Sequence, residues 1–210
     1  ARNGLTPIAR AAQYGVRYLP TGPIVKTKTT LFALSAVLFS SVLFAQEPVV
    51  GVAEPEKLFT DADPVLNRNK QATLHIMREL LQCGQWNRAG EWLTSRYIQH
   101  NPNAASGLDG VIYFFTLVLK VPRKDDCPVL TTQIAAVMAE DEYVTVLWPR
   151  TYVDPRDPAN SAAACQRVAA PPSKDCPGKT YSTSWFDTWR FVNGKADEHW
   201  DPATITPPAR

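Results

Sequence analysis

The sequence predicts an α+β domain in which three N-terminal helices pack on one face of a curved antiparallel sheet. Three observations lead to this fold class. Apolar residues recur at helical spacing between residues 63 and 119. Residues 131–153 and 181–201 then alternate with a period of two around turn-forming residues, which indicates two β-hairpins. The period changes near Pro122, so we expect the helices to come first and the sheet to follow.

Residues 1–45 are not expected to belong to the fold. A short basic region at Lys26–Lys28 precedes an apolar run at Leu31–Ala45, which has the composition of a signal peptide and is too short for a membrane span. Residues 1–24 are then either an extension upstream of a true start at Val25 or a basic N-terminal tail. The sequence therefore predicts a periplasmic or secreted protein with no membrane span in the mature chain.

The rest of the chain has the size of one domain. We expect a linker at residues 46–66 and the folded domain at residues 67–210. The net charge is +2 and no Lys/Arg cluster is present, which argues against a nucleic-acid partner.

The four cysteines are expected to form disulfides in an oxidising compartment. Cys165 and Cys176 close a short Ala- and Pro-rich loop, so we pair them, and Cys83 is left to pair with Cys127. Free buried thiols are the alternative if the protein is not exported. The first pair lies in a Pro-rich segment, Asp154–Lys179, which we interpret as a stapled insertion and a candidate lid over one end of the sheet.

The first helix has clear start and stop signals. Asp63 and Pro64 are typical of the N-cap and the first helical position, and Gly84 can end the helix in a left-handed conformation. The apolar stripe of this helix places His75 on the opposite face, where we expect a solvated side chain rather than a ligand.

Two further helices are expected. One spans about Trp86–Thr94, and the other begins with a capping box at Ser106–Asp109 and is largely buried through a wide apolar stripe that reaches Leu119. Asn101-Pro102 interrupts the helical pattern between them, which places His100 at the mouth of a loop.

The last hairpin places several titratable side chains on the sheet. It turns at Asn193-Gly194, a dipeptide that readily adopts the positive φ angles of a type I′ turn. The period of two then places His199 and Asp201 on one face. With a two-residue turn, Asp187 lies across from Trp200 and faces away from both, and a bulge in either strand would reverse that orientation.

Three segments resemble the SnoaL-like branch of the NTF2-like superfamily. They are the run NKQATLHIM… that ends at Pro102, the helix GLDGVIYFF, and FDTWRFVNGKADEHWD, and together they cover residues 67–201 in the family's order. The most specific parts are Tyr-x-x-His-Asn-Pro at 97–102 and the stretch from Asn-Gly-Lys to Glu-His-Trp-Asp at 193–201. The insertion and the signal peptide depart from the family, whose polyketide biosynthesis is normally cytoplasmic.

The resemblance implies a cone-shaped fold with a single apolar pocket and catalysis without a metal or organic cofactor. In SnoaL-like cyclases, a pocket aspartate abstracts a carbon-bound proton and a polyketide closes by an intramolecular aldol step; the matching position is Asp201. Independently, a carboxylate among Trp and Phe side chains is expected to have a raised pKa, which suits acid/base work near neutral pH. His199 and His100 are candidates to polarise a carbonyl or share the proton, and Asp187 is a weaker candidate.

Structural explanations of the same residues stay open. Asp201 can cap the end of a strand before Pro202, and His100 can bond the backbone of its loop. Trp148, Trp185 and Trp189 are more typical of a core than of a pocket lining. A metal site built from His100, His199, Asp187 and Asp201 is a further alternative, although their spacing matches no short metal motif.

Two classes of function follow. The first is a cofactor-independent lyase or isomerase that acts on a hydrophobic carbonyl compound with Asp201 as its base. The second is an exported module that uses the same cone to bind a small hydrophobic ligand or to assemble with a partner, without chemistry. The resemblance also implies a homodimer that pairs through the outer sheet face.

Overall fold

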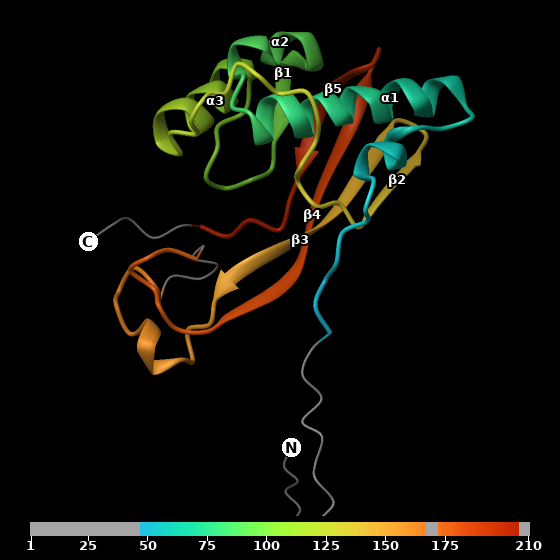
Figure 1. Cartoon of the computed structure of the whole chain (residues 1–210). Coiled ribbons are helices and arrows are strands. Elements are labelled where there is room, and N and C mark those ends of the chain that lie inside the picture. The colour runs from blue at the N-terminus through green and yellow to red at the C-terminus, as the bar shows by residue number, and fades with distance from the viewer. Residues whose placement is uncertain (1–46, 167–171, 206–210) are drawn as a thin grey trace, which may run out of the picture. The chain divides into compact units, whose positions relative to one another are not determined.

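The computed structural model of the chain describes residues 47–166 and 172–205. Residues 1–45, where the signal peptide and the start at Val25 are predicted, lie outside the described residues. In the described part, the helical layer and one strand come first and four further strands follow, and the five strands form one mostly antiparallel sheet (Figure 1). The predicted α+β class is confirmed.

Helix α1, Pro64–His75, begins as the sequence predicts. The Asp63 carboxylate accepts hydrogen bonds from the backbone N–H groups of Val65 and Leu66, which would otherwise lack helical partners. The chain continues as a wider π-helical segment, Ile76–Gln82, and ends at Gly84 with a φ of +64°. A Cβ at Gly84 would lie 2.7 Å from the carbonyl oxygen of Pro122, so both the conformation and the space require glycine.

The polar face of this helix is less solvated than predicted. His75 is only partly exposed: its ring stacks on Trp92 with centroids 4.0 Å apart, and its Nδ1 lies 2.7 Å from Oε1 of Glu79. The Glu79 carboxylate is buried and also accepts from the indole N–H of Trp92 and pairs with Arg88. The expected solvation of His75 is therefore wrong, because a buried carboxylate gathers donors on that face.

The second predicted helix is shorter than expected. A 3₁₀ turn at Trp86–Arg88 leads into helix α2, Ala89–Trp92, and the chain then extends as strand β1, Leu93–Gln99. This strand was not predicted from the sequence, because the stretch has helical spacing. Its partner in the sheet lies about a hundred residues later in the chain, so no local pattern announces the pairing.

The third helix, α3, Leu108–Tyr113, continues as π-helical turns over Phe114–Val118. The predicted capping box does not form, because the Ser106 hydroxyl accepts from the backbone N–H of Gln99 instead. Only Val111 and Phe114 of this segment are buried, so the prediction of a largely buried helix is wrong. Four of its apolar side chains are more than half exposed: Tyr113, Leu117, Val118 and Leu119.

The sheet has the strand order β1-β5-β4-β3-β2. The remaining strands are β2, Ala136–Glu140, β3, Tyr143–Val153, β4, Thr180–Val192, and β5, Lys195–Trp200. Both predicted hairpins form, although β2 begins five residues later than expected. All neighbouring strands are antiparallel except β1 and β5, which are parallel. We call the face that packs on the helices the inner face.

Strands β3 and β4 form a long ribbon that extends beyond the helical layer (Figure 1). The insertion lies at the far end of this ribbon, where the Cys165–Cys176 disulfide packs with Val153. The second predicted disulfide, Cys83–Cys127, is also present.

The segment predicted as a linker is packed against the domain. Residues Pro55–Phe59 form a 3₁₀ helix whose Phe59 is fully buried, and the backbone N–H of Val52 donates to the carbonyl of Ile134. The fold therefore begins well before residue 67. Among the described residues, no helix is both long and apolar enough to cross a bilayer.

Candidate functional site

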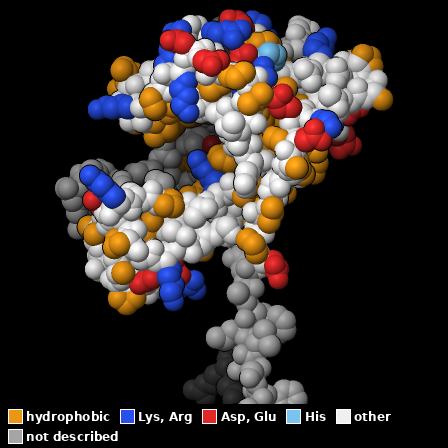
Figure 2. Space-filling view, in the orientation of Figure 1, with side chains coloured by type: hydrophobic (Ala, Val, Ile, Leu, Met, Phe, Trp, Pro, Cys, Tyr) orange, Lys and Arg blue, Asp and Glu red, His pale blue; other side chains and the backbone are white. Residues whose placement is uncertain are grey.

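A cavity of about 340 Å³ lies between the inner face of the sheet and the helices. This volume is at the lower end of the range for pockets that bind small molecules. Figure 2 shows that this side of the molecule is hollowed between the helical layer and the far part of the ribbon. Aromatic side chains make up a large part of the lining: Trp86, Tyr97, Phe114, Phe115, Trp148, Trp185 and Trp189.

The predicted tryptophans divide between core and lining. Trp189 is buried in the core and also borders the cavity. Trp148 and Trp185 are half-buried and line it, which is the less expected of the two outcomes.

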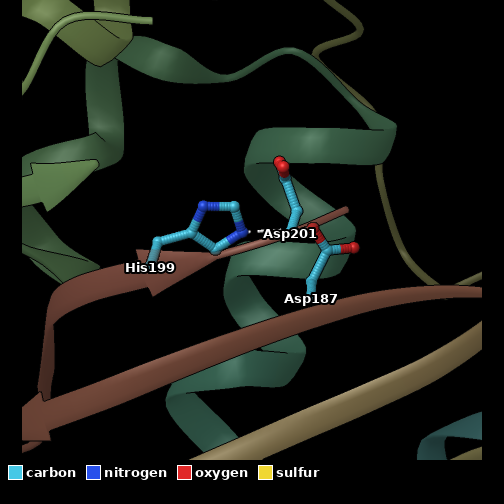
Figure 3. A group of neighbouring side chains, drawn as sticks. All are labelled: Asp187, His199 and Asp201. Atoms are coloured by element: carbon cyan, nitrogen blue, oxygen red, sulfur yellow. Dashed lines mark hydrogen bonds and ion pairs between the residues drawn. The ribbon is translucent and has the colours of Figure 1, made fainter. Parts of the chain in front are cut away.

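Three predicted site residues meet at the sheet side of the cavity (Figure 3). Asp187 lies on β4, His199 lies on β5, and Asp201 directly follows the last residue of β5. One ligand-type atom from each lies within 4.8 Å of the others. Asp187 and His199 are buried, and Asp201 is partly exposed.

A bulge in β5 brings Asp187 to this face. The turn has positive φ angles at Asn193 and Gly194, as predicted. From there, Phe191 pairs with Ala196 but Trp189 pairs with His199, so the β5 side holds one extra residue. The shift turns Asp187 to the side of His199, which is the reversal expected for a bulge.

The bulge is held by the side chain of Asp197. Its carboxylate accepts from the Thr94 hydroxyl at 2.7 Å, from Arg96 at 2.8 Å and from Arg190 at 2.6 Å. Burial alone would raise the pKa of Asp197, but the bonds from Thr94 and Arg190 and the two positive charges outweigh it and lower the pKa. Strand β1 therefore helps to fix the register of the catalytic candidates.

The hydrogen bonds around His199 define its tautomer. The Gln99 side-chain oxygen accepts from the backbone N–H of Asn101 at 3.0 Å and lies 2.8 Å from Nδ1 of His199. Because that oxygen can only accept, Nδ1 of His199 carries a proton. Its other nitrogen, Nε2, lies 3.1 Å from Oδ1 of Asp187, so these two atoms share one proton. The second oxygen of Asp187 accepts from the Trp148 indole at 2.6 Å.

Asp201 is held at the end of the strand by two hydrogen bonds. Asn101 donates to Oδ2 at 2.8 Å, and the backbone N–H of Ala203 donates to Oδ1 at 2.9 Å. The second bond is the strand-end cap that the sequence leaves open as an alternative role. Each oxygen of an ionised carboxylate has a second acceptor position, so capping leaves the group able to accept another proton or hydrogen bond.

Tyr97 adds a neutral hydroxyl to the lining. Burial strongly raises the pKa of Tyr97, although a hydrogen bond from the Trp189 indole at 3.0 Å acts in the opposite direction. The phenol therefore keeps its proton at physiological pH.

His100 lies apart from the other three candidates. Its Nε2 is 2.9 Å from Oε1 of Glu198, its ring stacks on Trp200 at 5.1 Å, and it does not line the cavity. Because Glu198 and Trp200 alternate with His199 along β5, this contact lies on the outer face. The structure thus brings together three of the four predicted residues.

The remaining three residues offer an imidazole and two carboxylates, which suit several divalent ions. Two of their donor atoms, Nε2 of His199 and Oδ1 of Asp187, already share a hydrogen bond, and His100 cannot complete the predicted metal set.

Four polar residues that also line the cavity were not predicted as site residues: Gln99, Asn101, Tyr97 and Arg150. Gln99 and Tyr97 lie on the unpredicted strand β1. Arg150 carried a usable signal, since the period of two along β3 places it on the same face as Trp148.

No family model and no curated protein matches the sequence. Among solved structures, the chain is similar to a candidate SnoaL-like polyketide cyclase from Jannaschia sp. CCS1, with 19% identity over 68% of this chain and 91% of that chain and a TM-score of 0.44. An NTF2-like protein from Burkholderia pseudomallei has 18% identity, coverages of 65% and 91%, and a TM-score of 0.40. The protein TerC, co-crystallised with polyporic acid, has 14% identity, coverages of 65% and 92%, and a TM-score of 0.38. These structural matches are to SnoaL-like and NTF2-like proteins, all at low identity.

Proposed function

We propose that the protein is an exported, cofactor-independent lyase or isomerase that abstracts a proton from a hydrophobic carbonyl compound, with Asp201 as the base. The observation that carries this proposal is the meeting of Asp187, His199 and Asp201 at an aromatic-lined cavity. Titratable groups that converge in an apolar pocket are the usual mark of acid/base catalysis.

Each group has a role that its hydrogen bonds support. The Asp201 carboxylate takes a proton from the carbon next to the carbonyl, and the electrons of that C–H bond form an enolate. The proton shared by His199 and Asp187 is available to the enolate oxygen, and Tyr97 offers a neutral O–H to the same oxygen. In an aldol closure, the enolate carbon then bonds to a second carbonyl carbon of the same molecule. The new alkoxide takes up the proton that Asp201 removed, which returns Asp201 to its carboxylate form.

The cavity supplies the conditions that such a step needs. Aromatic side chains line much of the cavity, so fixed donors act on the developing negative charge in a less polar surrounding than bulk water. Positioned acid/base groups of this kind contribute roughly 10² to 10⁴ in rate. No electrons are gained or lost overall, so the reaction balances with the substrate alone.

Export is part of the proposal and is supported by the two disulfides. Disulfides persist in oxidising compartments and are rare in the cytosol. The homodimer also stays a proposal, which the mass of the protein in solution would test.

Deuterium exchange tests the chemistry without knowledge of the natural substrate. The probe is 2-acetonaphthone, a neutral aryl methyl ketone, and mass spectrometry follows deuterium uptake from D₂O into its methyl group. We expect the native protein to accelerate the exchange and Asp201→Asn to lose roughly 10² to 10⁴ of that acceleration. Circular dichroism should show the fold retained. An equal rate in the variant, or a bound ketone that exchanges no faster than in buffer, would refute the proposed base.

A binding module without chemistry is the second candidate, and the Asp201 cap favours it. Both of its oxygens are already engaged, as is usual for a structural carboxylate. This candidate predicts that the protein retains the ketone in the cavity while exchange stays at the buffer rate.

A further inference from the structure

We propose that Arg150 forms an anion-binding subsite in the cavity, so that the ligand is an aromatic carbonyl compound that also carries an acidic group such as a carboxylate. This inference rests on the proposed function and narrows its substrate class. It comes from the position of Arg150, from its two indole neighbours and from the absence of a carboxylate partner among the residues that the structure describes.

The register of the ribbon places Arg150 away from the acid/base groups but on the same face. Asp187 pairs with Val146, Trp185 pairs with Trp148, and Arg150 follows two residues later. The side chains of alternate residues line one face, so Arg150 borders the same cavity as Asp187. Four residues of strand separate the pairing level of Asp187 from that of Arg150, which is roughly 13 Å along the sheet.

Two indole rings hold the guanidinium. Its central carbon lies 4.7 Å from the ring centre of Trp148 and 4.0 Å from that of Trp185. Stacking on the faces of a guanidinium leaves its N–H edge available, and that edge matches the two oxygens of a carboxylate.

No acidic side chain neutralises Arg150 within the described residues. Its guanidinium donates a hydrogen bond to the Tyr152 hydroxyl at 3.3 Å. Burial raises the pKa of Tyr152, and although Arg150 acts in the opposite direction, the net shift is upward, so this hydroxyl stays neutral. By contrast, Arg88 and Arg190 of the same domain each pair with carboxylates.

Asp187, the carboxylate that shares this face of the ribbon and the cavity with Arg150, is engaged elsewhere. Asp187 is bonded to His199 and to the Trp148 indole. A partly desolvated cation without a counter-charge favours the binding of an anion. The ligand would therefore lie with its acidic end at Arg150, its aromatic body along Trp148 and Trp185, and its carbonyl near His199.

The test compares two ligands of the same shape and different charge. Naphthalene-2-carboxylate and naphthalene-2-carboxamide are titrated into the full protein, and tryptophan fluorescence reports binding beside Trp148 and Trp185. We expect the native protein to bind the carboxylate at least tenfold more tightly than the amide. Arg150→Gln should remove this preference, and Arg150→Lys, which keeps the charge without the planar edge, should retain part of it. Unchanged thermal unfolding of both variants verifies the fold.

Several outcomes would overturn the inference. They are equal affinities in the native protein, an unchanged preference in Arg150→Gln, or no binding of either compound. A preference lost in His199→Gln but kept in Arg150→Gln would place the anion at the other end of the cavity and overturn it too. The exchange of 2-acetonaphthone, which has no acidic group, is measured separately. In the native protein, equal affinities for the two naphthalene compounds with accelerated exchange would refute only the anion site. A tenfold preference for the carboxylate without accelerated exchange would refute only the proposed base.

Discussion

Each face of strand β5 has one pair of a histidine and a carboxylate, and the two pairs have opposite surroundings. On the inner face, Nε2 of His199 lies 3.1 Å from Oδ1 of Asp187, and both side chains are 7% exposed. On the outer face, Nε2 of His100 lies 2.9 Å from Oε1 of Glu198, and these side chains are 45% and 18% exposed. Each histidine also has a tryptophan neighbour. The ring centroids are 5.1 Å apart both for Trp189 and His199 and for Trp200 and His100.

The difference shows that pairing alone does not define a catalytic site. Water competes for the outer pair, and Arg190 also binds Glu198, so the outer groups form part of a surface ion-pair network. The inner pair is enclosed by aromatic side chains, has a fixed tautomer and faces a cavity. Burial and an open space beside the pair are what distinguish the inner face.

The largest expected contrast is in activity. His199→Gln should lose roughly 10² or more of the acceleration of 2-acetonaphthone exchange, because it removes the shared proton beside the cavity. His100→Gln, the matched change on the outer face, should exchange at the native rate. Equal losses in the two variants would break the comparison and return His100 to the site.

Stability should separate the two carboxylates next. Asp187→Ala leaves the Trp148 indole and His199 without their buried acceptor, so we expect a loss of about 3 kcal/mol in the free energy of unfolding. Glu198→Ala removes a partly exposed acceptor and should cost about 1 kcal/mol or less. Urea unfolding of the three proteins measures both values, and similar losses would show that burial does not separate the two faces.

The bulge gives a third contrast, between Asp197 and its neighbour Glu198 on β5. Asp197→Ala leaves the Thr94 hydroxyl without its acceptor and removes one of the two carboxylates that bind Arg190, and we expect a loss of about 2 kcal/mol in stability. Because Asp197 fixes the register that turns Asp187 inward, the exchange of 2-acetonaphthone should fall as well. A variant with native exchange would show that the turn alone sets the register.

The smallest effect concerns pH and the outer face. The hydrogen bond from His100, followed by that from Arg190, lowers the pKa of Glu198 below its ordinary value of 4.5, despite an opposing effect of burial. The stabilisation that this carboxylate provides is therefore complete above pH 4.5 and is lost as the pH falls through the lowered pKa. We expect the stability difference between native protein and Glu198→Gln to shrink below pH 4.5 in urea unfolding, and a constant difference down to pH 2 would contradict this.

The sequence was sufficient for features that depend on neighbouring residues. The Asp63 cap, the left-handed Gly84 and the Asn193-Gly194 turn each follow from a side chain or a φ preference, and all three are present. Features that depend on distant partners were missed. Strand β1 forms because β5 lies beside it, and α3 leaves apolar side chains exposed because only one side of it packs.

The site shows the same division. The shared face of His199 and Asp201 follows from the period of two, and the structure keeps it. The orientation of Asp187 could be stated only as a condition, because the bulge is held by Thr94 and Arg96, which are a hundred residues away in the chain. His100 was predicted as a site residue because it lies at a loop mouth, directly before Asn101-Pro102. The pairing of β1 with β5 places it on the outer face instead.

The chain has three histidines, and each has a different surrounding: His75 in the helices, His100 on the outer face and His199 at the cavity. Their ring signals, assigned from single substitutions, can be followed by NMR as naphthalene-2-carboxamide is added. An aromatic ligand in the cavity should shift the ring signals of His199 and leave those of His100 and His75 in place. A shift at His100 alone, or at none of the three with the amide bound, would contradict the placement of the acid/base groups at a ligand-binding cavity.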